Sequence, residues 1–525
     1  MAKVKQNSTL FIIFLLSVIQ SFVFVHAFNG ASQGNALKLK LIHRYSPHYN
    51  GLHEDEKPKT QQELFRLLHS HDVVRHQMMS HRRQQHEEEE EEVESLRDDQ
   101  GVLLNSSGST TRRMVSEKRG SMAMPISSGW DYGSGQYLVK IKIGTPPQRF
   151  MLIADTGSDL TWINCRYRCG KRCGTHKGRL QHKRVFHADL SSSFKSVPCS
   201  SNLCRVGLSG MFSLNQCPTP SSPCKYDYSY IQLWGTPNSS TAEDVGAAYL
   251  EGAHAFGLFA NETVWASTAS GRRTKLENVI VGCTDHIKGG GGTGSIRDGD
   301  GILGLGFGRN SFTTKAALNF GGKFSYCLVD QQSPRNVSSY LTFGGHKPAT
   351  LRKKMRYTKL VVGNSDEKGS FYGVNVKGIS VGGKMLGIPP RVWDENLKGG
   401  TVVDSGTTLT FLKMPAYNAV MDVMTRALSK LKKLPTEGDP FEFCFSPKGF
   451  NESLVPKFAI HFADGAKFEP PVKAYALNVA VGRMCLGFVP TNVGPSVIGS
   501  IMQQHHLWEY DMGGKKLGFT PSPCT

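Results

Sequence analysis

The sequence predicts a mainly β protein built from two similar lobes that face one another. The chain has 525 residues, which is too long for one ordinary core. Its 56 glycines and 25 prolines recur between short apolar runs, a pattern typical of strands joined by turns. One pattern of strands and turns occurs twice, in residues 135–162 and again in residues 370–412. Repetition on this scale indicates two related lobes.

The first 27 residues have the layout of a secretory signal peptide. Two lysines come first, and an apolar run from Leu10 to Val25 follows them. The run is short for a full membrane span, so we expect cleavage after Ala27, with an uncleaved anchor as the alternative. No later stretch is apolar and long enough to cross a bilayer, so we expect no membrane span after cleavage.

Residues 28–120 differ from the rest of the chain and are predicted to be a removable prosegment, partly helical or disordered. They contain no cysteine, a helix-like stretch at residues 61–79 and six consecutive glutamates at 87–92. A run of like charge repels itself and stays solvated. This acidic run could dock on a basic body, and histidine protonation near about pH 6 could alter that contact. A merely soluble linker is the alternative.

The remaining body, residues 121–525, carries most of the positive charge. Only 16 of the 62 Lys and Arg residues and 15 of the 43 Asp and Glu residues lie before it, which leaves the body a net charge of +18. Dense basic stretches at 166–187 and 351–360 predict nonspecific contact with polyanions such as acidic polysaccharide or DNA. We divide the body into an N-terminal lobe, residues 121–345, and a C-terminal lobe, residues 346–525.

All twelve cysteines lie after residue 160, which together with a signal peptide indicates disulfides formed in an oxidising compartment. The four-residue spacing of Cys165, Cys169 and Cys173 suggests zinc as an alternative. No matching His or Cys pairs accompany them in the sequence, so we expect neither a metal nor a cofactor. Four glycosylation sequons of the body agree with the secretory route, at Asn238, Asn261, Asn336 and Asn451.

Two aspartates occupy corresponding positions in the two repeats. Asp155 lies in IADTGSDLTW and Asp404 in VVDSGTTLTF, each after a buried apolar strand. Burial of an ionised Asp is costly unless it is hydrogen-bonded, and Gly157 and Gly406 permit turns whose N–H groups reach the carboxylates. Either turn alone fits a structural Asx-turn. Two in corresponding positions predict that the lobes bring both carboxylates together.

A pair of aspartates in contact shares one proton, because both cannot easily ionise. The ionised carboxylate then takes a proton from a water molecule that attacks a peptide carbonyl, and its protonated partner donates to the carbonyl oxygen. The sequence contains no H-E-x-x-H motif that would favour a metal mechanism.

Five motifs are spread over residues 129–525: ADTGSDLTW, DGILGLG, FSYCLVD, VVDSGTTLTFL and VIGSIMQQHHLWEYDMGGKKLGFTPSPC. Together they resemble the pepsin-type aspartic proteases of the plant nepenthesin-like branch. The resemblance implies a bilobal fold with a catalytic cleft between the lobes. It also implies a monomeric endopeptidase made as a zymogen, with protein or peptide substrates and its own prosegment as partner.

The resemblance assigns roles to residues of both turns. Asp155 and Asp404 would be the catalytic pair. The hydroxyls that brace the turns against each other would be those of Thr156 and Ser405. The residues near substrate would be Gly157, Ser158, Gly406 and Thr407, with the two hydroxyls bonding the outer carboxylate oxygens. The implied disulfides are Cys165–Cys169, Cys173–Cys283, Cys199–Cys224, Cys204–Cys217, Cys327–Cys524 and Cys444–Cys485.

The sequence departs from the family pattern after Cys224. The family has a tyrosine at the head of the flap over the substrate, directly before x-[Asp/Glu]-Gly. Here CKYDYSY ends at Tyr230, but the Leu-Glu-Gly triplet follows only after nineteen more residues, of which Tyr249 is the last. Either tyrosine fits the flap position. Residues 231–249 are then a genuine loop or a retained intron.

Two other functions fit parts of the sequence. A non-catalytic binding or inhibitor protein could keep the fold, as xylanase-inhibitor relatives do, although those typically lose a catalytic turn that is intact here. The basic body also fits a DNA-binding protease of the chloroplast-nucleoid type. The signal peptide, sequons and cysteines favour the secretory pathway and the extracellular space, cell wall or vacuole, with the chloroplast as the alternative.

Overall fold

The structure is a computed structural model that describes residues 60–63, 65–66, 68–70, 72–73, 75–77, 79, 122–128, 137–167, 184–208, 213–214, 217–229, 254–267, 273–288, 300–330, 339–344, 349–362, 371–394, 400–437 and 439–524. Several predictions fall outside these residues and stay predictions: the signal peptide, the acidic run 87–92, Cys169, Cys173, Tyr230, Asn238, Tyr249 and Asn336. No helix among the described residues is both long enough and apolar enough to cross a membrane.

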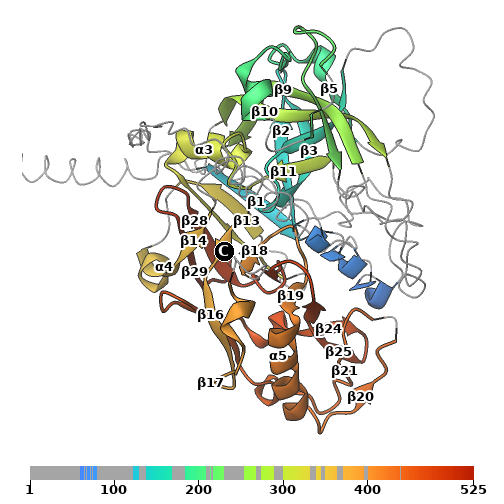
Figure 1. Cartoon of the computed structure of the whole chain (residues 1–525), viewed down its shortest axis with the longest axis vertical. Coiled ribbons are helices and arrows are strands. Elements are labelled where there is room, and N and C mark those ends of the chain that lie inside the picture. The colour runs from blue at the N-terminus through green and yellow to red at the C-terminus, as the bar shows by residue number, and fades with distance from the viewer. Residues whose placement is uncertain are drawn as a thin grey trace, which may run out of the picture.

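The predicted bilobal β architecture is confirmed (Figure 1). The main strands of the N-terminal lobe are β2 (Tyr137–Ile143), β3 (Gln148–Asp155), β4 (Thr161–Arg166), β8 (Lys225–Ser229), β9 (His254–Ser267), β10 (Arg273–Lys288) and β11 (Gly301–Gly304). Those of the C-terminal lobe are β15 (Gly373–Val374), β16 (Val376–Val381), β18 (Thr401–Val403), β19 (Thr410–Lys413), β22 (Phe458–Phe462), β24 (Ala476–Ala480), β25 (Arg483–Leu486), β26 (Phe488–Thr491) and β27 (Ser496–Ile498).

The sequence repeat corresponds to one arrangement of strands that occurs in both lobes. In the N-terminal lobe β11 runs parallel to β3 and antiparallel to β4, with Gly304 opposite Asp155. In the C-terminal lobe β27 runs parallel to β18 and antiparallel to β19, with Ile498 opposite Val403. Each aspartate therefore lies at the end of a strand whose neighbour is a short, fully buried strand.

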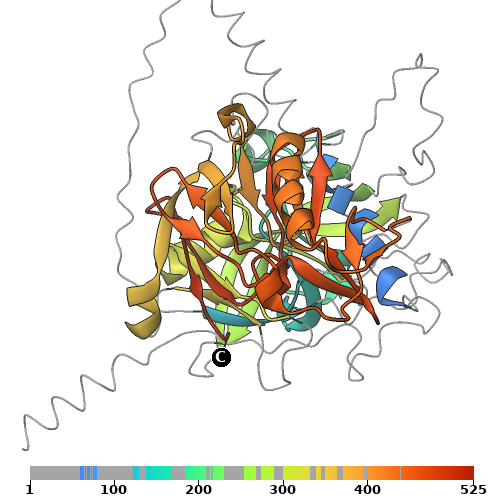
Figure 2. The ribbon, with the colours of Figure 1, turned by 90° about the horizontal axis from the view of Figure 1, so that it is seen from below.

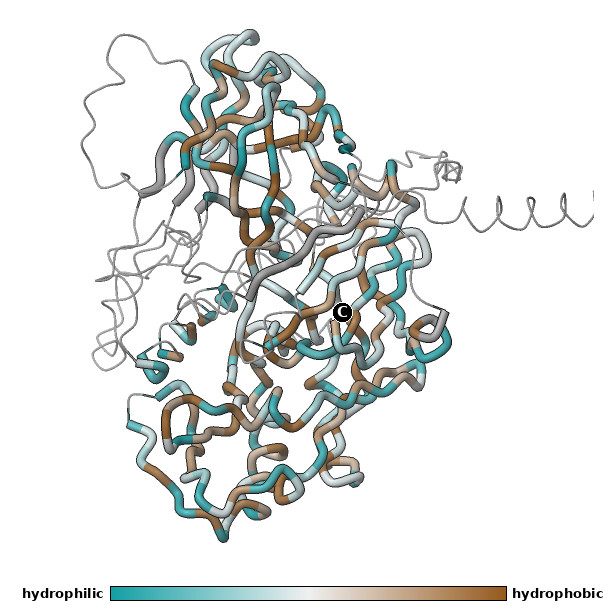
Figure 3. Tube along the Cα trace, turned by 180° about the vertical axis from the view of Figure 1, so that it is seen from behind, coloured by the Kyte–Doolittle hydropathy of each residue, from teal (hydrophilic) through white to brown (hydrophobic). Residues whose placement is uncertain are grey.

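A sheet shared by both lobes joins them. Its strands follow the order β14 (Arg356–Val361), β29 (Lys516–Pro521), β28 (His506–Asp511), β12 (Lys323–Cys327), β13 (Ser339–Phe343) and β1 (Met122–Ser128). Four aromatic rings in mutual contact cover one face of this sheet, those of Phe324, Tyr326, Tyr372 and Tyr510. Figure 3 shows hydrophobic and hydrophilic residues alternating along parts of these strands. The central strands β12 and β28 are buried at consecutive positions, so both of their faces are covered.

The helices of the body are short and lie outside the strands. In α5 (Met414–Ala427) the buried residues recur three or four positions apart, so one face of the helix packs on the C-terminal lobe. In α3 (Phe312–Phe320) Ser311 accepts a hydrogen bond from the Thr314 N–H at the first turn. Gly321 ends that helix with φ +89°, a conformation that favours glycine. The third, α4 (Ala349–Lys354), precedes β14.

The implied disulfide pattern is partly wrong. Cys327–Cys524 and Cys444–Cys485 are present. Cys165, however, bonds to Cys283 instead of Cys169, so the pairing of Cys173 with Cys283 is wrong as well. The physical reason is that β4 and β10 run side by side, with Ile163 opposite Cys283. The Cα atoms of Cys165 and Cys283 are consequently 4.9 Å apart, within the usual range for a disulfide.

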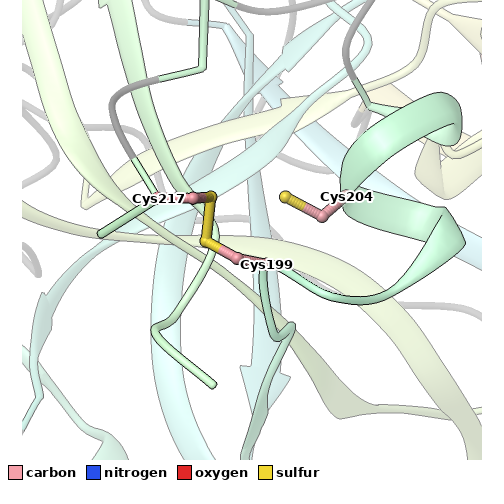
Figure 4. Close-up of side chains that lie close together, drawn as sticks. All are labelled: Cys199, Cys204 and Cys217. Atoms are coloured by element: carbon pink, nitrogen blue, oxygen red, sulfur yellow. A yellow bond between two sulfur atoms is a disulfide. The ribbon is translucent and has the colours of Figure 1, made fainter. Parts of the chain in front are cut away.

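The two pairings near residue 210 are exchanged relative to the implied pattern. The structure has Cys199–Cys217 and Cys204–Cys224, not Cys199–Cys224 and Cys204–Cys217. Figure 4 shows the Cys199–Cys217 bond with the sulfur of Cys204 facing it, and these three sulfurs lie within 4.8 Å of one another. Sulfurs this close allow more than one pairing, so spacing along the chain does not select between them.

Peptide mapping tests the exchanged pairs. We expect unreduced protein, cut at Leu203 and fragmented at the prolines between Cys217 and Cys224, to yield Cys199 joined to Cys217 and Cys204 joined to Cys224. Mass spectrometry with a reduced sample as control reads this out, and a Cys199–Cys224 fragment would contradict the structure.

Candidate active site

Asp155 lies at the C-terminal end of β3, in a turn that holds both of its carboxylate oxygens. The Gly157 N–H donates to Oδ1 at 2.9 Å, and the Ser158 hydroxyl donates to Oδ2 at 2.5 Å. The side chain is only 1% exposed. These hydrogen bonds compensate for the loss of water around a buried carboxylate.

Asp404 has the same surroundings in the second lobe. It follows β18, and the Gly406 N–H donates to Oδ1 at 3.1 Å while the Thr407 hydroxyl donates to Oδ2 at 2.5 Å. The side chain is completely buried. Because each contact has a counterpart around Asp155, the two turns are chemically equivalent halves of one site.

Hydrogen bonds between the lobes hold the two turns together. The Thr156 N–H donates to the Ser405 hydroxyl at 3.1 Å, and the Ser405 N–H donates to the Thr156 hydroxyl at 2.8 Å. The Ser405 hydroxyl in turn donates to the Ala154 carbonyl at 2.9 Å. The Thr156 hydroxyl also lies 3.2 Å from Oδ1 of Asp404, so the brace reaches a carboxylate itself. The structure thus brings together the turn residues that the sequence singled out.

Both turns require glycine for a steric reason. A Cβ atom on Gly157 would approach Oδ1 of Asp404 to 3.0 Å, and a Cβ on Gly406 would collide with Oδ1 of Asp155. Each glycine therefore lies against the carboxylate of the opposite lobe. The absence of both side chains is what permits the two aspartates to approach one another.

A buried hydrogen-bond chain lies behind Asp404, and the sequence analysis did not find it. Nε2 of Gln503 donates to the main-chain carbonyls of Asp404 at 3.0 Å and Ile498 at 2.7 Å. Its Oε1 accepts from the Tyr326 hydroxyl, whose oxygen lies 2.7 Å from that of Tyr510. Tyr326 belongs to β12, so this chain ties the position of Asp404 to the sheet that joins the lobes.

A guanidinium group occupies the space between the two carboxylates. NH1 of Arg75 donates to Oδ2 of Asp155 at 2.8 Å, and NH2 donates to Oδ1 of the same carboxylate. Its Nε donates to Oδ2 of Asp404 at 2.6 Å, and NH2 reaches Oδ1 at 3.1 Å. Arg75 thus binds all four oxygens of the pair. The sequence marked residues 61–79 as helical but gave no signal for which side chain would face the aspartates.

The described residues between 61 and 79 are helical and lie between the lobes, against the C-terminal lobe (blue in Figures 1 and 2). We call them the inserted helix. Its apolar side chains Phe65, Leu68 and Met79 join a buried cluster with residues of the C-terminal lobe, including Phe411 and Phe441. Phe65 meets Phe441 edge-on at 5.4 Å between ring centroids.

Polar contacts fix the register of the inserted helix. Asp72 accepts from the N–H groups of Thr408 at 2.9 Å and Leu409 at 2.6 Å, directly after the Asp404 turn. His76 donates to the Pro495 carbonyl at 2.7 Å and stacks on the Phe411 ring. The acidic run predicted to dock on the basic body lies outside the described residues. The contact in the structure has the opposite charges: Arg75, a cation of residues 28–120, binds two aspartates of the body.

The charges of Arg75 and Asp404 follow from their burial and from their contact with each other. Burial lowers the pKa of Arg75, but the charges of Asp155 and Asp404 outweigh it and hold that pKa well above its usual value. Burial raises the pKa of Asp404. The charge and hydrogen bonds of Arg75, with those of Thr407 and Gly406, outweigh burial and leave the pKa below its usual value. The guanidinium therefore remains charged and keeps Asp404 ionised.

The other titratable groups of the inserted helix shift in different directions. Burial raises the pKa of Asp72 to about 7, against the two N–H groups that it accepts from. Burial lowers the pKa of His69 to about 4, and it lowers the pKa of His76 despite the hydrogen bond to Pro495. Both histidines are therefore held in the neutral form in this contact.

Some predicted site residues are not placed. Tyr230 and Tyr249, the two flap candidates, lie outside the described residues, although the strands on either side of them, β8 and β9, pair with Ser229 opposite His254. Of the sequons, Asn261 lies half-buried in β9, and Asn451 is exposed and accepts a hydrogen bond from the Ser453 N–H. Glycosylation of these asparagines stays a prediction.

Comparison with known proteins gives the family. The model described as "Xylanase inhibitor N-terminal" matches residues 137–245 and 234–345, and "Xylanase inhibitor C-terminal" matches residues 371–521. The two N-terminal matches overlap inside the segment that the sequence marks as an insert. Aspartyl protease family protein 2 from Arabidopsis thaliana is 32% identical over 409 residues, covering 77% of this chain and 74% of the relative. Aspartic proteinase nepenthesin-1 from Nepenthes gracilis is 30% identical over 398 residues, covering 75% and 79%.

The chain therefore belongs to the pepsin-like aspartic protease family, in the plant branch that includes the nepenthesins. Solved structures agree on the fold. Basic 7S globulin from soybean matches with a TM-score of 0.57 at 16% identity, covering 78% of this chain and 96% of that one. The structure titled "edgp" matches with a TM-score of 0.57 at 19% identity, covering 77% and 95%.

Replacement of Arg75 by alanine should loosen the inserted helix. The change removes the cation from a buried ion pair, which typically costs about 3–5 kcal/mol. We expect the backbone amides of residues 61–79 in the full-length chain to exchange hydrogen at least about tenfold faster. Arg66→Ala, at an exposed position of the same helix, is the matched control and should leave exchange unchanged. Equal exchange in both variants would show that Arg75 does not hold the helix.

Proposed function

We propose that this protein is an aspartic endopeptidase made as a zymogen. The observation that carries the proposal is the contact of the Asp155 and Asp404 turns across the two lobes, with both carboxylates oriented by equivalent hydrogen bonds. The relatives named above as aspartic proteases support the same activity. The substrates would be proteins or peptides met in the secretory pathway, the cell wall or the vacuole.

The mechanism uses the dyad after Arg75 has left. Without the cation, two adjacent buried carboxylates share one proton. The ionised member takes a proton from a water molecule as the water oxygen bonds to the peptide carbonyl carbon, and the protonated member donates to the carbonyl oxygen. The resulting diol then collapses: the ionised carboxylate takes a proton from a diol hydroxyl, the C–N bond breaks, and the protonated carboxyl gives its proton to the leaving amine. The Ser158 and Thr407 hydroxyls keep the carboxylates oriented during these transfers.

The inserted helix supports the zymogen part of the proposal. Arg75 binds the carboxylate oxygens that would otherwise hold the attacking water, and the apolar side chains of the helix cover part of the C-terminal lobe. Residues 28–120 would therefore be a prosegment that occupies the site until it is removed. Signal-peptide cleavage after Ala27 and removal of this segment would leave the two-lobed body.

A second candidate is a binding or inhibitor protein that keeps the fold without catalysis. It is favoured by the description of both matching family models, which names xylanase inhibitors. Two features of this chain favour catalysis over that alternative. Both aspartates are present, and every hydrogen bond that orients one carboxylate within its turn has a counterpart on the other.

Asp155→Asn separates the two candidates. Asparagine cannot exchange a proton with Asp404, and loss of general acid–base catalysis typically costs about 10²–10⁴-fold in rate. We expect the variant, freed of its prosegment, to lose peptide cleavage by at least about 10²-fold while the wild type is blocked by pepstatin. Asp422→Asn on the exposed side of α5 is the control. Full activity of Asp155→Asn would exclude the proposed mechanism.

Low pH should weaken the binding of the inserted helix to the body. In solvent His69 and His76 have an ordinary pKa of 6.5, whereas burial lowers both in the docked helix, so release takes up protons as the pH falls below about 6.5. Asp72 acts oppositely, because its docked pKa of about 7 exceeds its ordinary 3.8 and release gives up a proton. Once Arg75 has left, the two aspartates also take up the proton that they share, so release takes up more protons than it gives up. Docking should therefore weaken as the pH falls below about 6.5.

Labelled pepstatin measures this pH dependence. The ratio of its affinities for the full-length and the prosegment-free chain reports release, because the pH dependence of pepstatin binding to the open site cancels. His69→Asn with His76→Asn should flatten the trend, because release would then no longer protonate the two histidines. Asp72→Asn should steepen it, because release would then no longer give up the Asp72 proton. A ratio that does not change with pH in the wild type would contradict the assigned shifts.

A further inference from the structure

A groove on the shared sheet has the features of a ligand site separate from the cleft. It is a hollow of about 500 Å³ where β14 and β29 meet the turn before β29, and its principal lining residues are Tyr357, Lys359, Asp464, Lys515 and Lys516. We call it the Tyr357 groove. None of its lining residues contacts the aspartates or the inserted helix in the described part of the chain.

The tyrosine is held flat against the sheet. Its hydroxyl donates at 2.9 Å to Oε1 of Glu509, a carboxylate that is only 4% exposed. To reach it the ring crosses β29 at Gly518, the residue opposite both Tyr357 and Glu509. A Cβ atom on Gly518 would lie 2.6 Å from Cε1 of the ring, so the glycine makes room for it. Tyr357 nevertheless remains 41% exposed, which leaves part of an immobilised ring open to solvent.

Like charges lie close together beside the ring, and this arrangement destabilises the protein when no ligand is bound. Lys359 and Lys516 lie directly opposite each other on paired strands, and like charges in that position are destabilising. Asp511 lies opposite Lys516 on the other neighbouring strand, but its carboxylate pairs with Lys323 at 2.6 Å. Lys515 has a backbone φ of +46°, a conformation that residues other than glycine rarely adopt. One acid, Asp464, lines the groove and accepts from the Lys359 N–H at 2.8 Å. Three lysines against one carboxylate leave the lining with a net positive charge.

We propose that the Tyr357 groove binds an acidic saccharide, a chain of uronate-type sugars. The apolar face of a sugar ring stacks on an aromatic ring, and a carboxylate on each sugar would pair with the lysines. An anion between Lys359 and Lys516 removes their repulsion, which accounts for two like charges in paired positions. The fixed, exposed ring favours a sugar over a phosphate polymer, because phosphate recognition by lysine alone would not need it.

The site is tested on the full-length chain by calorimetric titration with oligogalacturonate. A neutral oligosaccharide of equal length and single-stranded DNA are the comparison ligands. We expect oligogalacturonate to bind and the neutral chain to bind at least about tenfold more weakly, because the lysines would have no carboxylate to pair with.

Two pairs of variants locate the binding. Lys359→Gln with Lys516→Gln should weaken oligogalacturonate at least about tenfold. Lys377→Gln with Lys432→Gln removes the same charge from exposed positions elsewhere and should change affinity by less than about twofold. Tyr357→Ala should weaken binding, whereas Tyr357→Phe, which loses the same hydrogen bond to Glu509 but keeps the ring, should retain it.

Three results would overturn the proposal. They are the absence of oligogalacturonate binding, an equal loss in the two lysine pairs, and DNA that binds as tightly and responds to the same substitutions. The last two would show only general attraction of polyanions to a basic body. Each variant is first checked for an unchanged thermal transition, so that loss of binding is not loss of folding.

Discussion

The exchange of hydrogen bonds between Thr156 and Ser405 is the interaction on which the site depends. Each residue gives its N–H to the hydroxyl of the other, so the two turns are tied by a reciprocal pair across the lobes. Because each turn also holds its own carboxylate, fixing the turns fixes the distance between the acids. Each lobe has an equivalent pair of parallel strands behind its turn, β3 with β11 in the N-terminal lobe and β18 with β27 in the C-terminal lobe. These pairs place the two turns symmetrically.

The electrostatic consequence is a buried site for one positive charge. Two carboxylates in contact repel, and they are stable together only if a proton or a cation lies between them. Here Arg75 supplies the cation and binds all four oxygens. A guanidinium is too large to coexist with a water molecule and a peptide in the same place. Arg75 therefore stabilises the two aspartates and occupies the space between them. Its removal would change the ionisation of the aspartates.

The shared sheet connects this site to the rest of the molecule. Its inner face carries the aromatic rings and Tyr326, which through Gln503 reaches the main chain of Asp404. Its edge, where β14 lies beside β29, carries the Tyr357 groove, in which Gly518 and Glu509 hold a ring open to solvent. The same strands thus support two surfaces of different chemistry, one acidic and enclosed, the other basic and exposed.

Sequence patterns alone predict the two-lobed β fold, the paired aspartates and the turn residues around them. Those features rest on local patterns: apolar strands, glycines and hydroxyls at fixed spacing from an acid. Only the tertiary structure decided the role of Arg75, the chain through Gln503 and the exchanged pairs of Cys199, Cys204, Cys217 and Cys224. Each of these joins residues distant in the sequence or selects one pairing among cysteines whose sulfurs lie near one another. Spacing along a chain does not determine which of several nearby side chains will be in contact, because the contacts depend on how the strands pack in three dimensions.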